Sequence, residues 1–129
     1  MEKRIINPWN WQNDRSYVQA VEIKNPQATL YVSGQTAIND VGISSHDDMR
    51  PQLLQAIKNV EKVVFDADYE LKSIVKLNIY TTSNDELLES FDLLQQWIEK
   101  HHIKQAMTVI EVKSLFESLK VELEVTVVK

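Results

Sequence analysis

The stretch Val121-Glu122-Leu123-Glu124-Val125-Thr126-Val127, close to the C-terminus, alternates between apolar and polar side chains at every step. Successive side chains of a strand point to opposite faces of a sheet, so the pattern predicts a strand with one buried face. Val75, Leu77 and Ile79 alternate in the same way with Lys76, Asn78 and Tyr80. Three further runs rich in strand-forming residues are predicted to complete the sheet, at 17–23, 30–33 and 107–112.

Two segments between these strands have the period of a helix. Their apolar residues recur every three or four positions, at Leu53, Ile57, Val60, Val64 and Ala67 and at Leu87, Phe91, Leu94 and Ile98. Asp47-Asp48 and Ser83-Asn84-Asp85 precede them and offer side-chain oxygens to the first helical turns. The elements then follow in the order β-β-α-β-α-β-β. This order predicts an α+β fold with two helices on one face of a mixed sheet, and the other face is left for contacts between subunits.

Composition limits the class of protein. The 129 residues include only two glycines and three prolines, so no linker is indicated and we expect a single domain over residues 1–129. The formal net charge of −5 disfavours nucleic acid as a partner. There is no cysteine, no apolar leader follows the charged N-terminus, and no stretch is long enough to span a bilayer. We therefore expect a cytoplasmic protein with no membrane partner.

The residue types that hold metals or phosphates form no motif here. His46, His101 and His102 lack the spacing of a metal-binding pair on one helix. Gly34 and Gly42 are the only glycines, so the chain has no glycine-rich phosphate loop and no nucleophile turn of the GxSxG type. We expect neither a metal ion nor a cofactor.

Four stretches of the chain carry a family resemblance: LYVSGQT at 30–36, QAIKNVE at 55–61, IVKLNIY at 74–80 and VELE at 121–124. In register and in order they resemble the reactive-intermediate-deaminase family, also called the Rid or YjgF-type family, from about Ser16 to the C-terminus. The resemblance implies a chorismate-mutase-like fold assembled as a homotrimer, with three ligand clefts between neighbouring subunits. Members hydrolyse imines and enamines of 2-amino acids to 2-oxo acids and ammonia, without a cofactor.

The resemblance also implies which residues line such a cleft. The family's water-orienting glutamate falls on Glu122, and its ligand-lining tyrosine falls on Tyr17. Its backbone-contact strand falls on Ser33, Gly34 and Gln35. Glu124 lies on the same predicted strand face as Glu122 and serves as the comparison carboxylate, for which solvent exposure or a lysine pair is sufficient.

Two positions depart from the family pattern. The arginine whose guanidinium fork holds the substrate carboxylate falls on Met107, and a thioether cannot pair with a carboxylate. An asparagine of many members falls on Phe91. Both changes make the expected pocket more apolar, although core packing alone would also explain Met107 and Phe91. The chain thus resembles a branch without the deaminase arginine, for which deaminase activity does not follow from the resemblance.

Three functions stay open on the sequence. Glu122 could orient a water for imine or enamine hydrolysis, while Tyr17 and backbone groups near Ser33 hold the substrate and Arg15 supplies positive charge from a new direction. The same cleft could bind a small carbonyl-bearing or partly apolar metabolite without turnover. A ribonuclease function, a label sometimes attached to the family, is disfavoured by the net charge of −5. Trp9 and Trp11 are expected to pack the N-terminal arm rather than to cover a cleft.

Overall fold

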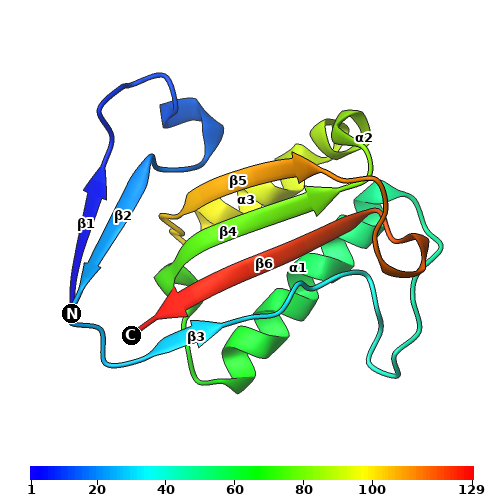
Figure 1. Cartoon of the computed structure of the whole chain (residues 1–129), viewed down its shortest axis with the longest axis horizontal. Coiled ribbons are helices and arrows are strands. Elements are labelled where there is room, and N and C mark those ends of the chain that lie inside the picture. The colour runs from blue at the N-terminus through cyan, green and yellow to red at the C-terminus, as the bar shows by residue number, and fades with distance from the viewer.

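Four strands form the main sheet in the spatial order β3-β6-β4-β5 (Figure 1). The computed structural model describes residues 1–129. The strands are β3 (Thr29–Tyr31), β4 (Ile74–Thr81), β5 (Ala106–Glu111) and β6 (Val121–Val128). β6 is antiparallel to β3 and to β4, whereas β4 and β5 run parallel. The sheet is therefore mixed, and the predicted α+β class is confirmed.

One face of this sheet is the apolar wall of the core. The odd-numbered residues of β6 from Val121 to Val127 are buried, while Glu122, Glu124 and Thr126 on the other side are half-buried. The register sets Leu77 of β4 opposite Val125 and Ile79 opposite Leu123. The alternation read from the sequence thus assigns each side chain of β6 to its face.

Three α-helices connect the strands: α1 (Met49–Asp66) lies between β3 and β4, and α2 (Asn84–Glu89) and α3 (Phe91–Lys100) lie between β4 and β5. Figure 1 shows α1 and α3 behind the sheet, and their apolar stripes enter the same core cluster as the buried strand residues. Each fully buried Val, Leu or Ile side chain contributes about 1.5–3 kcal/mol to folding. The segment with α2 and α3 also forms the crossover that parallel strands β4 and β5 require.

The second helical segment is not the single helix that its periodicity predicts. It is interrupted at Ser90, whose φ of −111° and ψ of 8° end α2 and start α3. Serine competes with the helix for backbone hydrogen bonds, which makes it a suitable residue for such a break. Leu87, Phe91 and Leu94 nevertheless all pack in or against the core. The period was therefore right and the continuity was wrong.

Of the two predicted helix caps, the one at α2 forms and the one at α1 does not. Ser83 caps α2, because its hydroxyl accepts the backbone N–H of Glu86 at 3.2 Å. Asp48 occupies the cap position of α1, yet its side chain makes no capping bond. Gln52 ties the segment down instead, because its Nε2 donates to the carbonyl of Asp47 at 2.9 Å.

The N-terminal arm differs most from the prediction. β1 (Glu2–Ile6) and β2 (Ala20–Lys24) form a separate antiparallel hairpin beside the main sheet (Figure 1). The strand predicted over 17–23 therefore starts later and lies outside the main sheet, and β1 was not predicted because EKRII is mostly charged. The arm joins the sheet through Gln105, whose carbonyl accepts the N–H of Val18 at 3.0 Å and whose Nε2 donates to the Ser16 carbonyl at 2.9 Å.

None of the helices combines the length and the apolar character that crossing a bilayer requires.

Candidate functional site

The sheet face that the helices leave uncovered, here called the open face, carries the candidate site. It consists of the residues that alternate with the core-facing ones, among them Tyr31, Asn78, Tyr80, Glu122 and Glu124. In the antiparallel pairing of β4 and β6, Tyr80 lies opposite Glu122 and Asn78 lies opposite Glu124. Tyr31 on the edge strand β3 is 81% exposed. The open face thus brings two carboxylates and two tyrosines to one side of the sheet.

Glu124 is held by its neighbours on β4 through one carboxylate oxygen. Its Oε1 accepts the Nδ2–H of Asn78 at 2.9 Å and the hydroxyl of Tyr80 at 3.3 Å. Burial raises the pKa of Tyr80, and the charge of Glu124 raises it further, so the phenol stays protonated and donates. These hydrogen bonds to the neighbouring strand give Glu124 a structural role, which explains its presence without a part in catalysis.

Glu122 is the carboxylate of this face with no partner inside the chain. Burial raises the pKa of Glu122, and the nearby charge of Glu124 adds to the effect, with no hydrogen bond or cation to oppose them. A half-buried carboxyl group with a raised pKa exchanges a proton more readily near neutral pH than an ordinary one. Among the residues of the open face, Glu122 is the best suited to hold and activate a water.

Gly34 forms the surface on which the Glu122 side chain lies. A Cβ at position 34 would stand 2.5 Å from Cδ of Glu122 and 2.7 Å from its Cγ and Oε1, so only glycine leaves room for this placement. The neighbouring Gln35 pairs with Leu123 through two backbone hydrogen bonds of 2.7 and 2.9 Å. The segment with Ser33 and Gly34 is thereby fixed beside β6, and the structure brings Ser33, Gly34 and Glu122 together.

Tyr17 lies near the start of β5, toward the opposite end of the sheet from Glu122. It follows Ser16, whose carbonyl is bonded to Gln105 just before β5 begins. The start of β5 pairs with Lys76, four residues along β4 from Tyr80, the partner of Glu122. At about 3.3 Å per residue this separation is roughly 13 Å along the strand. Tyr17 lines a pocket with residues of α3 and of the segment that follows it, and Glu122 is not part of that pocket.

Met107 and Phe91 lie on the side of the sheet opposite Glu122. Met107 is in register with the buried Leu77, and its sulfur lies 4.0 Å from Nε2 of Gln105. Phe91 begins α3, and both side chains are partly buried against the hydrophobic core. Core packing explains both, and their part in lining a cleft stays a prediction.

An aromatic cluster surrounds Tyr17 on the N-terminal arm; it consists of Trp9, Trp11, Tyr17 and Arg15. The two tryptophan rings stack at 5.9 Å, and Trp11 meets Tyr17 edge-on at 6.5 Å. Cζ of Arg15 stands 5.2 Å from the centre of the Trp11 ring, within the range of a cation–π contact. The tryptophans pack on one another, as expected for the arm, yet Trp11 remains 51% exposed. The cluster therefore keeps a surface that a ligand or another subunit could cover.

Sequence reasoning missed the hydrogen-bonding role of Asn78 and Tyr80. The signal was present, because both alternate with core residues of a predicted strand and so had to face the same side as the glutamates of β6. Only the pairing register, which no single strand reveals, sets them opposite Glu124 and Glu122. No group of three or more His, Asp or Glu side chains has the arrangement of a metal site.

Comparison of the sequence with known proteins identifies the family to which the chain belongs. The sequence pattern of the family described as Endoribonuclease L-PSP matches residues 11–129. The chain belongs to this family. A RutC family protein of Aquifex aeolicus (strain VF5) is 30% identical over 113 residues, which are 88% of each chain. The predicted relationship to the Rid and YjgF proteins is thereby confirmed, as the solved structures also show.

Two solved structures carry the Rid and YjgF names. The first is a Yersinia pestis protein of unknown function, YyfB of the conserved Rid protein family; it is 26% identical, has a TM-score of 0.86 and matches along 100% of both chains. The YjgF gene product of Escherichia coli is 25% identical with a TM-score of 0.71, over 88% of this chain and 87% of its own. The full-length match to the Yersinia protein includes the N-terminal hairpin, so the arm is part of a fold that another Rid-family protein shares.

Proposed function

We propose that this Rid-family chain assembles as a homotrimer and hydrolyses small imines or enamines at Glu122, with release of ammonia. The observation that carries the proposal is the Glu122 carboxylate, which is half-buried, lies over Gly34 and has no partner within the chain. Membership in the family supports the reaction class, because the resemblance to Rid deaminases implies it.

The chemistry needs one water and one group that can take and return a proton. The water oxygen attacks the carbon of the protonated C=N bond while Glu122 accepts a water proton, which gives a neutral amino alcohol. Glu122 then gives this proton to the nitrogen. As the C–N bond breaks, the hydroxyl proton passes to Glu122 and on to the departing ammonia, so the products are a carbonyl compound and ammonium. A carboxyl group with a raised pKa suits these transfers, because its two protonation states lie closer in free energy near neutral pH.

A neighbouring subunit would supply the groups that one chain lacks at Glu122. Tyr17 of the same chain lines a different pocket, so the tyrosine at this site would come from a second copy. Trp11 contacts both Tyr17 and Arg15, and a subunit that brings Tyr17 therefore brings the Arg15 guanidinium as well. Arg15 would then hold the substrate carboxylate in place of the arginine that Met107 replaces.

The assembly is tested first, because the proposed site depends on it. We expect light scattering at micromolar concentration to give three times the chain mass of 15.0 kDa. A monomer would remove the proposed site. The arrangement predicts that mixed trimers of Arg15→Ala and Glu122→Gln chains regain some activity, because a site with both native residues forms only where two different copies meet.

Activity is then measured as ammonia release from 2-iminobutanoate generated in situ. We expect Glu122→Gln to lower the rate by a factor of about 10² or more, the usual contribution of a proton-transfer group. Glu124→Gln is the matched control on the same strand and is expected to retain most of the rate. A wild type without activity, or Glu122→Gln at the full rate, would contradict the proposal.

A second candidate function is ligand binding without turnover. The observation that favours it is that Met107 faces the core, so that no guanidinium of the chain itself lies beside Glu122. In that case a small carbonyl-bearing metabolite would raise the melting temperature while no product forms.

An endoribonuclease function, which the family description names, is disfavoured. The net charge of −5 and the two carboxylates of the open face, Glu122 and Glu124, repel a phosphodiester backbone. RNA cleavage that survives removal of contaminating nuclease and is lost on substitution of Glu122 would overturn this view.

A further inference from the structure

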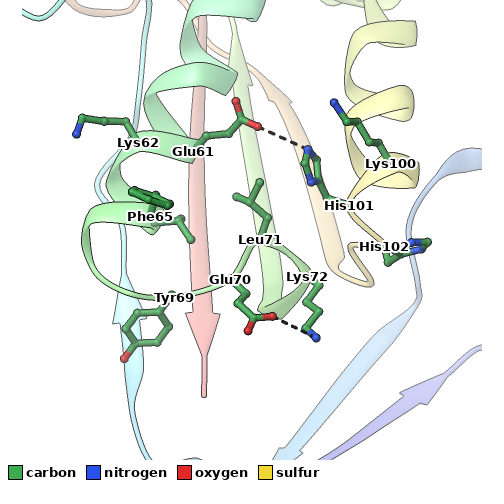
Figure 2. Close-up of a pocket in the computed structure, with 11 residues that line it drawn as sticks. Glu61, Lys62, Phe65, Tyr69, Glu70, Leu71, Lys72, Lys100, His101 and His102 are labelled. Atoms are coloured by element: carbon green, nitrogen blue, oxygen red, sulfur yellow. Dashed lines mark ion pairs between the residues drawn. The ribbon is translucent and has the colours of Figure 1, made fainter.

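A second pocket lies between the C-terminal ends of α1 and α3, and none of its lining residues belongs to the open face (Figure 2). Its volume is about 650 Å³, within the range of small-molecule sites. The apolar part of its lining comes from Val64, Phe65, Tyr69 and Leu71. Phe65 is 76% exposed, so a large aromatic ring stands in solvent at the edge of this pocket.

Beside the pocket, polar contacts add to the apolar packing that joins the two helices. Oε2 of Glu61 on α1 accepts the indole N–H of Trp97 at 3.3 Å and lies 3.6 Å from Nε2 of His101. Figure 2 shows the Glu61–His101 pair reaching from α1 to the end of α3. Leu71 lies between this pair and the segment with Glu70 and Lys72. These contacts link α1 to the end of α3 at the edge of the pocket.

The charge of the lining is opposite to the charge of the chain. Lys62, Lys72 and Lys100 line the pocket together with two histidines, against only two carboxylates, in a protein of net charge −5. Both carboxylates have a partner, Glu61 in His101 and Glu70 in Lys72 at 3.1 Å, and Lys62 is held by Asp66 at 2.7 Å, just outside the lining. Lys100, at the end of α3, is one of the lining residues and forms no ion pair (Figure 2). An incoming anion therefore meets an uncommitted cation.

The ends of the helices do not reverse this preference. Helix C-termini carry partial negative charge on free carbonyls, which would favour a cationic ligand. Here the carbonyls are occupied within the chain: Trp97 accepts from the N–H of His101, Ile98 accepts from Ile103, and Val64 accepts from Tyr69. Lys100 is left as the lysine of the lining that no carboxylate neutralises.

We infer that this pocket is a binding site for a small aromatic carboxylate, with the ring against Phe65 and Leu71 and the carboxylate at Lys100. The apolar lining and the exposed phenyl ring account for the ring, and the uncommitted lysine accounts for the anion. The site is separate from Glu122 and does not depend on the reaction proposed there.

The test uses the full chain and two probes of the same shape, 2-naphthoate and 2-naphthylmethylamine, in calorimetric titrations. We expect the carboxylate to bind and the amine to bind at least about tenfold more weakly, which corresponds to one charge contact. Lys100→Glu is expected to weaken naphthoate binding by about tenfold or more. Lys58→Glu, an exposed lysine of α1 outside the pocket, makes the same change in net charge and is expected to leave the affinity within about twofold.

Backbone amide shifts in NMR spectra locate the bound probe. We expect naphthoate to shift the amides around Leu71 and His101 and to leave those around Gly34 unchanged. Equal binding of the two probes, equal effects of Lys100→Glu and Lys58→Glu, or shifts centred on Gly34 would each overturn the inference. Glu122→Gln is expected to retain naphthoate binding, so failure of this site and failure of the hydrolytic proposal are separate results.

Discussion

Gly34 and Glu122 are in contact although 88 positions separate them in the sequence: the glycine backbone forms the surface on which the glutamate side chain lies. A Cβ at position 34 would come within 2.5 Å of Cδ of Glu122, which is closer than side-chain atoms approach one another. The obstructed atoms belong to the end of a flexible side chain and not to backbone. Gly34 therefore acts on the direction of the Glu122 carboxylate and not on the integrity of the sheet.

The first prediction follows from this contact. Gly34→Ala is expected to turn the Glu122 carboxylate away from its present place while the fold persists. Ammonia release, or ligand binding if there is no turnover, should fall by about tenfold or more, since small displacements of a reacting group are costly. The melting temperature should change little. The two measurements are the rate with 2-iminobutanoate and a thermal unfolding curve.

Gly42→Ala is the matched control for this prediction. Gly42 has a φ of +85°, and a Cβ there would meet no atom within 4 Å. Alanine at position 42 is therefore expected to cost about 1–2 kcal/mol of stability through backbone strain and to leave the rate unchanged. If Gly34→Ala kept the full rate, the contact with Glu122 would have no functional role.

The second prediction concerns the titration of Glu122. Burial raises the pKa of Glu122 above its ordinary value of 4.5, and the negative charge of Glu124 contributes. Glu124→Gln removes that charge, so the pKa of Glu122 should move down, and the acid limb of the rate profile should move to lower pH with it. The carboxyl ¹³C shift of Glu122 measures this pKa directly, with or without turnover.

Glu89→Gln makes the same change in net charge on the exposed surface of α2 and is expected to leave the Glu122 titration in place. A Glu122 titration that is the same in wild type and Glu124→Gln would show that the two carboxylates do not interact.

The third prediction concerns the ion pair that joins α1 to α3. The guanidinium of Arg50 binds both oxygens of Asp92, at 2.8 and 2.7 Å. This hydrogen bonding lowers the pKa of Asp92 below its ordinary value of 3.8. A lowered pKa in the folded state stabilises the protein above the ordinary value, and the contribution is lost as the pH falls through the lower folded pKa.

The wild type should accordingly be more stable than Asp92→Asn at neutral pH, and this difference should shrink in acid. Urea unfolding of both proteins at neutral and at acid pH measures the difference. The effect should be small because both side chains are about half exposed. A difference that grew in acid would contradict the assignment.

The sequence was sufficient to predict what depends on local pattern. The strict alternation of β6 assigned Glu122 and Leu123 to opposite faces, and the structure has them so. The helical period likewise placed Leu87 and Leu94 in the core. Such patterns succeed because burial is repeated at every turn or every second residue, so one irregular position does not hide the signal.

What sequence reasoning missed depends on contacts between distant segments. β1 exists because β2 pairs with it, and its own charged residues give no sign of a strand. The break at Ser90 was hidden because the apolar stripe of Leu87 and Leu94 continues across it. The distance of Tyr17 from Glu122 follows from the arm joining the sheet at Gln105, which no local pattern reveals.

The fourth prediction concerns Gln52, a polar residue on the buried face of α1 that is 1% exposed. Its Nε2 donates to the carbonyl of Asp47, and its Oε1 accepts the N–H of Lys120, each at 2.9 Å. The side chain thus joins the start of α1 to the residue before β6. Gln52→Leu keeps the volume close but leaves two backbone groups without partners, at about 1–3 kcal/mol for each buried group.

We therefore expect Gln52→Leu to lower the free energy of unfolding by about 2–4 kcal/mol, measured by urea unfolding at neutral pH. Gln55→Leu, one helical turn along α1, is the control. Gln55 donates to Oδ1 of Asn59 at 2.9 Å in a partly buried position, where water can replace the lost bond, so its loss should cost about 0.5–1.5 kcal/mol. Equal losses in the two variants would mean that the contact between Gln52 and Lys120 does not hold the start of β6, and with it Glu122, in place.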